Sequence, residues 1–304
     1  MLNMITISRK FPVTLSYLKE ILMKKDIHSL PSQIRRDIVR MVHDAQSGHP
    51  GGSLGTVEFF TALFFDVLQD IDPSRFDAEN STGEDVFILS NGHITPVYYS
   101  VLARRGYFPV SELATFRRMG SRLQGHPSVH DRLPGVRIAS GSLGQGLSVA
   151  LGVAQGKKLN KDPHLVFTLH GDGELQEGQI WEAVLYAGAK GVDNLVATVD
   201  YNNAQIDGPV EKVLNLGDLR AKFEAFGWTV LDIEQGNDLD AVIQGLRKAR
   251  SLTGQGKPVA VLLHTLMGYG VDFMQGDYRW HGKPLNDEQL EKALAQLPET
   301  WGDY

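Results

Sequence analysis

The sequence contains no cysteine among its 304 residues. A chain without cysteine cannot form disulfides, zinc–thiolate sites or a cysteine nucleophile. It also lacks an apolar run long enough to cross a membrane, and its first residues lack the continuous apolar core of a signal peptide. These absences fit a reducing compartment, so we expect a cytoplasmic protein that has no membrane partner.

The chain also lacks the excess of positive charge that a nucleic-acid partner requires. Lysine and arginine number 30 against 36 aspartates and glutamates, which gives a net charge of -6. Proteins that bind nucleic acid usually present a basic surface to the phosphates. With 42% hydrophobic and 22% charged residues, the composition is typical of a soluble globular protein. We therefore expect no nucleic-acid partner.

Glycine, in contrast, is abundant, with 32 residues. Many of them fall into short clusters: "SGHPGGSLG", "SNGH", "SGSLGQG", "HGDGELQEG" and "GYG". Because glycine has no side chain, such clusters let a ligand or another backbone segment approach closely. The clusters therefore predict loops that bind a ligand.

Strand-like and helix-like segments alternate through the second half of the chain. The strand-like segments are 165–169, 194–200, 228–233 and 258–264, and an earlier one is 85–89. The helix-like segments between the last four are 178–191, 217–227 and 238–252. This alternation predicts an α/β fold, a doubly wound parallel sheet with helices on both faces.

The first half of the chain is mainly helical in pattern. Helices are predicted at about 31–46, 53–68, 95–106, 111–120 and 144–159, and a charged, solvent-facing tail helix at 286–297. The phenylalanine-rich "FFTALFF" within 53–68 is expected to belong to the core or to a subunit contact. Residues 1–28 are interpreted as an N-terminal arm, amphipathic at 11–24, and residues 29–304 as one domain with a C-terminal tail.

A carboxylate and an amide follow two successive strands of the predicted sheet. Asp172 comes directly after one strand, and Asn202 follows the next, 30 residues later. One βαβ unit needs about that spacing, and ligands of such sheets bind beyond the carboxyl ends of the strands. Carboxylate and amide oxygens suit Mg²⁺, which often shares its ligands with a diphosphate. The alternative is that Asp172 and Asn202 are two unrelated turn residues.

These motifs resemble the thiamine-diphosphate motif of transketolases. The similarity covers "GDGELQEG…NNAQIDG", upstream "SGHPGGSLG", "LSNGH", "QGHP" and "SGSLGQG", and downstream "MGYG" and "WHGKP". It extends over roughly residues 30–290 in the order of the family. The resemblance implies the diphosphate-binding domain of the thiamine-diphosphate-binding fold. One departure is Ser142, which stands where transketolases often have proline.

The resemblance also assigns roles to residues. It implies that Mg²⁺, with Ca²⁺ or Mn²⁺ able to replace it, is held by Asp172, Asn202 and the carbonyl of Ala204. It implies that thiamine diphosphate is held by His93, Gly141, Leu143, Gly173 and His281. Glu177 matches a family position that links the two active sites of a dimer. The resemblance further implies that His49, His126 and His281 face the substrate and handle its protons.

The other histidines are expected to be surface or turn residues. They are His28, His43, His130, His164, His170 and His264.

The resemblance further implies a partner chain. In transketolases, the glutamate that activates the cofactor and most arginines that bind the sugar phosphate come from a pyrimidine-binding domain. No segment here resembles that domain, and the chain stops at Tyr304, soon after the first domain's motifs. We therefore expect this chain to be the N-terminal subunit of a split transketolase, in an α2β2 assembly with a C-terminal subunit. The enzyme would transfer a two-carbon ketol unit between sugar phosphates, in the pentose phosphate pathway or in a more specialised pathway.

Three alternatives remain at this point. The chain could belong to a deoxyxylulose-phosphate synthase-like enzyme, or be the α subunit of a 2-oxo-acid dehydrogenase, because both share the "GDG…N" motif. Neither explains "SGHPGG", "GHP" and "WHGKP" together. The chain could also be a non-catalytic thiamine-diphosphate-binding protein that has kept the fold.

Overall fold

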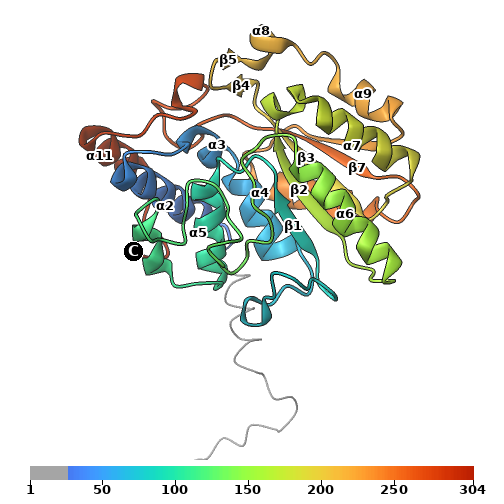
Figure 1. Cartoon of the computed structure of the whole chain (residues 1–304). Helices are drawn as coiled ribbons and strands as arrows, with labels where there is room; N and C mark the ends of the chain where they lie inside the picture. Colours follow the sequence, from blue (N-terminus) through green and yellow to red (C-terminus); the bar gives the residue numbers. More distant parts are fainter. Residues whose placement is uncertain (1–26) are drawn as a thin grey trace, which may run out of the picture.

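Five parallel strands form the central sheet of the computed structural model, which describes residues 27–304 (Figure 1). In chain order they are β1 (Val86–Leu89), β2 (Val166–Gly171), β3 (Leu195–Tyr201), β6 (Thr229–Ile233) and β7 (Val259–His264). Across the sheet the order is β1-β2-β3-β7-β6. This arrangement confirms the predicted α/β fold with a parallel sheet. The arm at 11–24 lies outside the described residues, and the domain boundary after residue 28 stays a prediction.

Successive residues of each strand face opposite sides of the sheet, and both sides are buried. In β1, Val86 and Ile88 belong to one hydrophobic core, whereas Phe87 and Leu89 belong to the other. Such two-sided burial is typical of parallel sheets, and it explains why the strands read as nearly continuous apolar runs. The sheet is therefore the middle layer of three.

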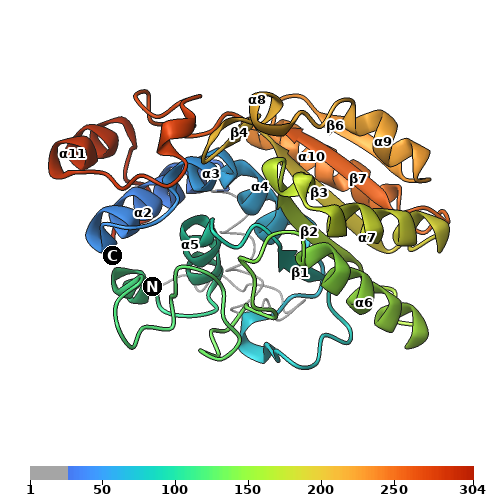
Figure 2. The ribbon, with the colours of Figure 1, turned by 45° about the horizontal axis from the view of Figure 1, so that its top comes forward.

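Helices form the two outer layers (Figures 1 and 2). The side to which Val86 points is covered by α6 (Gly146–Leu159), α7 (Gly178–Ala189) and α9 (Leu219–Ala225). The side to which Phe87 points is covered by α2 (Leu30–Ala45), α4 (Val57–Ala62), α5 (Thr95–Arg105) and α10 (Leu239–Ser251). The prediction of helices on both faces is thus confirmed.

The helix predicted at 53–68 is divided in the structure. Its parts are α3 (Pro50–Gly55), α4 and a π-helical turn (Leu63–Val67). The division falls at Thr56, whose hydroxyl donates a hydrogen bond of 2.8 Å to the Gly52 carbonyl. Phe59, Phe60 and Phe64 are buried in the core, as predicted for the phenylalanine-rich stretch.

Two further elements differ from the prediction. The prediction of a helix at 111–120 is wrong. The chain forms only a 3-10 helix (Val110–Thr115) and then turns at Arg117, whose φ is +56°. The two-residue strands β4 (Ala204–Gln205) and β5 (Gly208–Pro209) and the short helix α8 (Val210–Leu214) were not predicted.

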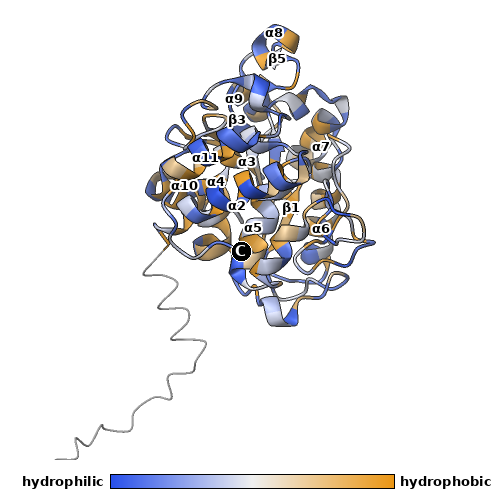
Figure 3. Ribbon diagram, turned by 90° about the vertical axis from the view of Figure 1, so that its left-hand side faces the viewer, coloured by the Kyte–Doolittle hydropathy of each residue, from blue (hydrophilic) through white to orange (hydrophobic). Residues whose placement is uncertain are grey.

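The tail helix is α11 (Asp287–Gln296), which begins with a capping box between Asn286 and Gln289. Within α11 only Ala293 is buried, so the helix faces solvent as predicted. Short 3-10 helices complete the described chain at Pro73–Arg75, Gly173–Gln176 and Tyr278–Trp280. Figure 3 shows that the outer helices carry both hydrophilic and hydrophobic residues, and in residues 27–304 none is long and apolar enough to cross a membrane.

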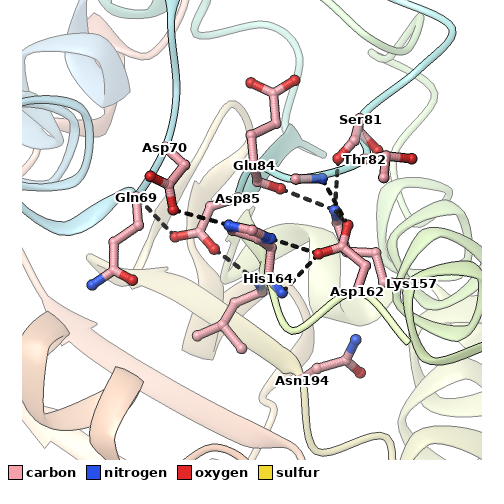
Figure 4. A network of polar contacts seen from close by, with 12 residues as sticks. Gln69, Asp70, Ser81, Thr82, Glu84, Asp85, Lys157, Asp162, His164 and Asn194 are labelled. Atoms are coloured by element: carbon pink, nitrogen blue, oxygen red, sulfur yellow. Dashed lines mark hydrogen bonds and ion pairs between the residues drawn. The ribbon is translucent and has the colours of Figure 1, made fainter. Parts of the chain in front are cut away.

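A polar network holds the segment before β1 against the ends of α6 and β2 (Figure 4). The ammonium of Lys157 donates to the carbonyls of Ser81 and Glu84, at 2.8 and 2.9 Å, and forms an ion pair of 2.8 Å with Asp162. His164 lies between Asp162 and Asp70, with ring nitrogens 2.5 and 3.0 Å from their carboxylates. This network closes the amino-terminal edge of the sheet and leaves the carboxyl edge for a ligand.

Candidate functional site

The sheet register places the predicted metal ligands side by side. Gly171, the last residue of β2, pairs with Asp200 of β3. Asp172 and Asn202 therefore leave two neighbouring parallel strands at the same edge. The backbone N–H of Asp172 donates to the Asp200 carbonyl at 3.2 Å, which holds the two strand ends together. The structure thus brings together the residues that the βαβ spacing predicted.

A cavity of about 300 Å³ lies at this edge of the sheet. It collects loops that follow β1, β2, β3 and β7, together with the loop before α6. Ten predicted site residues line it: His49, His93, Gly141, Leu143, Asp172, Gly173, Glu177, Asn202, Ala204 and His281. His126 is the one predicted site residue outside the lining, and it lies at the edge of the histidine group described below.

Asp172 is a buried carboxylate, with only 1% of the residue exposed. Its oxygens accept hydrogen bonds from the backbone N–H groups of Gly173 and Asn203, at 2.7 and 2.5 Å. Burial, followed by the nearby carboxylate of Asp200, raises the pKa of Asp172 to about 7, although these hydrogen bonds oppose the rise. A buried carboxylate of this kind is stabilised when a cation binds beside it.

Asn202 is oriented by hydrogen bonds on both sides of its amide. Its Nδ2 donates to Asp200 at 2.9 Å, and its Oδ1 accepts from the Ala204 N–H at 2.9 Å. The hydroxyl of Thr265 also donates to Asp200. Burial raises the pKa of Asp200 to about 7, although Thr265 and Asn202 oppose the rise. The amide orientation therefore depends on a buried aspartate that the sequence analysis did not single out.

The donor set fits a hard divalent cation. It offers a carboxylate oxygen from Asp172, an amide oxygen from Asn202 and the backbone carbonyl of Ala204, all on residues that line one cavity. Oxygen ligands with few charges are those that Mg²⁺ prefers, and Mg²⁺ commonly shares its sphere with phosphate and water. The Gly173 N–H, predicted to contact a diphosphate, donates here to Asp172.

Four loops bring four histidines together, three of which line the cavity. The ring centre of His49 lies 5.0 Å from that of His93, 5.5 Å from His281 and 6.5 Å from His126. The Nδ1 atoms of His49 and His281 and the Oδ1 of Asn91 are buried without a hydrogen-bond partner among residues 27–304. Buried polar atoms are normally paired, so these three are available to a polar ligand.

The histidines are kept neutral mainly by burial. Burial, followed by the charges of His281, Arg117 and His126, lowers the pKa of His49 to about 4. Burial also lowers the pKa of His281, and holds that of His93 well below its ordinary value. Neutral imidazoles at physiological pH can accept a proton from a substrate hydroxyl and return it later.

Close packing explains why glycines accompany these histidines. A Cβ at Gly92, next to His93, would lie 2.4 Å from the Ser140 hydroxyl and 2.8 Å from the Gly141 nitrogen. A Cβ at Gly141, whose φ is +123°, would lie 2.5 Å from the His126 ring. Only glycine therefore lets the loops after β1 and before α6 approach each other and the His126 ring so closely.

Glu174 is a buried residue of the site that the sequence analysis missed. One oxygen accepts hydrogen bonds from the Ser90 hydroxyl and from the Gly144 N–H, the latter at 2.9 Å, and the other accepts from the Gly171 N–H at 3.2 Å. His170 lies 3.6 Å away. Burial would raise the pKa of Glu174, but His170 and these donors lower it, so the residue is ionised.

Two other predictions concern residues near Glu174. Glu177 is the N-cap residue of α7, and its Cβ would lie 2.9 Å from a Cβ at Gly144. Its role in linking two active sites stays a prediction. The expectation for His170 is wrong, because this residue is only 2% exposed and lies within β2, where its Nε2 is 2.8 Å from the Thr168 hydroxyl. A single-sequence pattern does not separate a buried strand histidine from a turn histidine.

Comparisons with known proteins agree with this geometry. Residues 28–302 match the family "transketolase, thiamine diphosphate binding domain". The chain is 37% identical over 272 residues to the 6-deoxy-6-sulfo-D-fructose transketolase subunit SqwG of Clostridium sp. (strain MSTE9), covering 90% of this chain and 96% of that protein. It is 36% identical over 289 residues to one of the subunits of the apulose-4-phosphate transketolase of Actinobacillus succinogenes (strain ATCC 55618), covering 95% and 99%.

A solved structure gives the same result. The transketolase from Leishmania mexicana superposes with a TM-score of 0.82 and 29% sequence identity, over 89% of this chain and 41% of that one. The chain thus corresponds in fold and sequence to about two fifths of a longer transketolase chain. On the family match, the relatives and the shared fold, this chain belongs to the transketolase family, and its residues 28–302 match the thiamine diphosphate-binding domain of that family.

Proposed function

We propose that this chain is the N-terminal subunit of a two-chain transketolase. It would hold the Mg²⁺–diphosphate half of the cofactor, and a separate C-terminal subunit would supply the pyrimidine-binding half of the site. The observation that carries the proposal is one cavity whose lining includes both the oxygen ligands around Asp172 and the histidines His49, His93 and His281. The relatives named as transketolase subunits, which the chain covers almost completely, support the separate partner.

The residues divide into two sets with different roles. Asp172, Asn202 and the Ala204 carbonyl would hold Mg²⁺, while His93 and Gly173 would bind the diphosphate. The Gly173 N–H would become available to the diphosphate as the Asp172 carboxylate turns to the cation. Gly141 and Leu143 would contact the ring system of the cofactor from the loop before α6, and Glu177 would connect two such sites in an α2β2 assembly.

The histidines would serve the substrate. Thiamine diphosphate, when bound, supplies the electron sink for breaking and forming the carbon–carbon bond. His49, His126 and His281 would hold the sugar hydroxyls in place and carry the proton that leaves and returns during the transfer. Burial lowers the pKa of each of these imidazoles, so each is unprotonated at neutral pH and has a nitrogen free to accept a proton.

The substrates would be a ketose and an aldose that bear an anionic group. The names of the relatives include a sulfonated fructose and apulose 4-phosphate, both anionic ketoses. A phosphorylated sugar is a metabolite of the cytoplasm, so a cytoplasmic location fits the proposal. Both the pentose phosphate pathway and a pathway for a less common sugar are compatible with the site.

Ketol transfer by the purified chain, with and without a candidate C-terminal subunit, tests the proposal. Transfer from xylulose 5-phosphate to ribose 5-phosphate would be assayed first, followed by 6-deoxy-6-sulfo-D-fructose and apulose 4-phosphate as donors. We expect activity that requires Mg²⁺, thiamine diphosphate and both chains. Activity of this chain alone would contradict the two-chain assignment. A cofactor-bound mixture that is inactive with all three donors would contradict ketol transfer.

A further inference from the structure

Arg117 connects the two loops that carry His49 and His126. Its Nη1 donates to the hydroxyl of Ser47 at 2.9 Å, and its Nη2 donates to the carbonyl of Gly125 at 3.4 Å. Ser47 lies two residues before His49, and Gly125 directly precedes His126. One guanidinium therefore spans both loops at the points where they enter the histidine group.

Backbone strain and close packing fix the position of this guanidinium. Arg117 has a φ of +56°, a left-handed conformation that is uncommon for residues other than glycine. Its N–H donates to the Leu123 carbonyl at 2.8 Å, which closes the turn. A Cβ at Gly125 would lie 2.4 Å from the Arg117 Cζ, so the guanidinium packs directly against the backbone beside His126.

The charge of Arg117 is not balanced by a carboxylate in the described part of the chain. Its Nε is buried without a hydrogen-bond partner among residues 27–304, and the phenol of Tyr99 is its titratable neighbour on α5. An arginine stays protonated across the physiological pH range, so an uncompensated positive charge persists beside the histidines.

This charge acts on both neighbouring imidazoles. Desolvation, followed by the charge of Arg117, lowers the pKa of His126. The charge of Arg117 also lowers the pKa of His49, although burial and the charge of His281 have larger effects. The other groups that face this pair are His93 and His281 across the cavity. Burial, followed by the charge of Asp131, raises the pKa of Tyr99.

We propose that Arg117 is a positioning residue that ties the His49 loop to the His126 loop and places a fixed positive charge beside both imidazoles. The inference rests on the proposed function, in which these histidines handle substrate protons. Arg117 is not among the residues that line the cavity, so we infer that it acts through the two histidines. Lysine could replace its charge but not its two directed hydrogen bonds.

Histidine NMR on the full-length chain tests this role without cofactor, partner or activity. The imidazole signals of His49 and His126, assigned with His49→Asn and His126→Asn variants, would be titrated in the wild type, Arg117→Gln and Arg117→Lys. We expect the titration midpoint of His126 to rise by at least about half a pH unit in Arg117→Gln, because a like charge has been removed. In Arg117→Lys the midpoint should stay near that of the wild type.

Hydrogen exchange measures the second part of the role. Amides of residues 45–49 and 124–127 should exchange faster in both arginine variants, since neither can bridge the loops, while the strands of the sheet keep their protection. Ser47→Ala removes the hydroxyl acceptor alone and should loosen residues 45–49 even if Arg117→Gln fails to fold. If Arg117→Gln does not fold, the charge effect can be measured in the wild type. Added salt screens the charge of Arg117, so the titration midpoint of His126 should rise.

Each outcome has a defined meaning. An unchanged His126 midpoint in folded Arg117→Gln, or no salt effect in the wild type, would overturn the electrostatic role. Unchanged exchange of both loops in the arginine variants and in Ser47→Ala would overturn the bridging role. Because no cofactor is present, either failure would leave the proposed function standing. Failure of thiamine diphosphate to bind would leave these results on Arg117 unaffected.

Discussion

The carboxylate of Glu174 accepts a hydrogen bond from the Ser90 hydroxyl, across the interior of the site. Ser90 follows β1, and the same carboxylate also accepts from Gly144 before α6 and from Gly171 at the end of β2. Ser90 in turn accepts from the Gly146 N–H at 3.2 Å. One buried anion thus fixes three of the loops that line the cavity.

Replacement of Glu174 by alanine should destabilise the chain strongly. The change leaves the Ser90 hydroxyl and two backbone N–H groups without an acceptor in a buried position, at about 1–3 kcal/mol for each group. We expect the free energy of unfolding, measured by urea titration, to fall by about 3 kcal/mol or more. The control is Glu224→Ala on the surface of α9, which should change it by less than about 0.5 kcal/mol. Similar effects of the two changes would show that Glu174 does not hold the loops.

Alanine substitutions at two glycines should have opposite effects. Gly92→Ala places a Cβ 2.4 Å from the Ser140 hydroxyl and should destabilise the chain by about 1–3 kcal/mol through overpacking. Gly152→Ala adds a methyl group with no atom within 4 Å, inside α6, and should stabilise by about 0.5–1 kcal/mol. Thermal melting of the two variants checks both signs. A Gly92→Ala chain as stable as Gly152→Ala would disprove the close approach of the loops.

The network below the sheet should make stability depend on pH through His164. Burial alone would lower the pKa of His164, but hydrogen bonds to Asp70 and Asp162 raise it above its ordinary value. A histidine with a raised pKa stabilises the fold below its unfolded pKa, near 6.5, and this contribution is lost as pH rises through the folded pKa. The stabilisation should therefore be complete near pH 6 and mostly absent near pH 9.

Unfolding of His164→Gln at several pH values measures this contribution. The variant should be less stable than the wild type by about 0.5–1 kcal/mol near pH 6, a figure reduced for the partial exposure of the group. The difference should shrink toward pH 9. Asp70→Asn removes one of the two carboxylates beside His164, so the stability of this variant should depend less on pH than that of the wild type. A difference that stays constant from pH 6 to pH 9 would contradict the raised pKa.

The sequence predicted the parts of the site that depend on strand order. Asp172 and Asn202 could be placed together because βαβ units are short and their strands are parallel neighbours. The four histidines could be selected because each lies beside a glycine in a loop, and the structure shows that at Gly92 this glycine is required by packing. Such signals are local and survive in a single sequence.

Other features depend on contacts that a single sequence does not contain. Glu174 reads as an ordinary acidic residue near a helix start, and only the folded structure shows the donors that surround it. Arg117 falls within the predicted helix at 111–120, but the chain has already turned there to reach the histidine loops. The strands at 204–205 and 208–209 are too short to leave a periodic pattern.

The dissociation constant of thiamine diphosphate in the presence of Mg²⁺ tests the central claim most directly. It would be measured by calorimetry for the wild type, Asp172→Asn and, as a control, Asp287→Asn, whose side chain is 97% exposed. Loss of even an outer-shell partner of a metal commonly weakens metal binding by about 10–100-fold. Because Asp172 would contact the metal directly, we predict that Asp172→Asn weakens thiamine diphosphate binding by about 100-fold or more. Asp287→Asn should leave the dissociation constant unchanged. Equal affinity of Asp172→Asn and wild type, or no Mg²⁺-dependent binding by the wild type with or without its partner chain, would contradict the account.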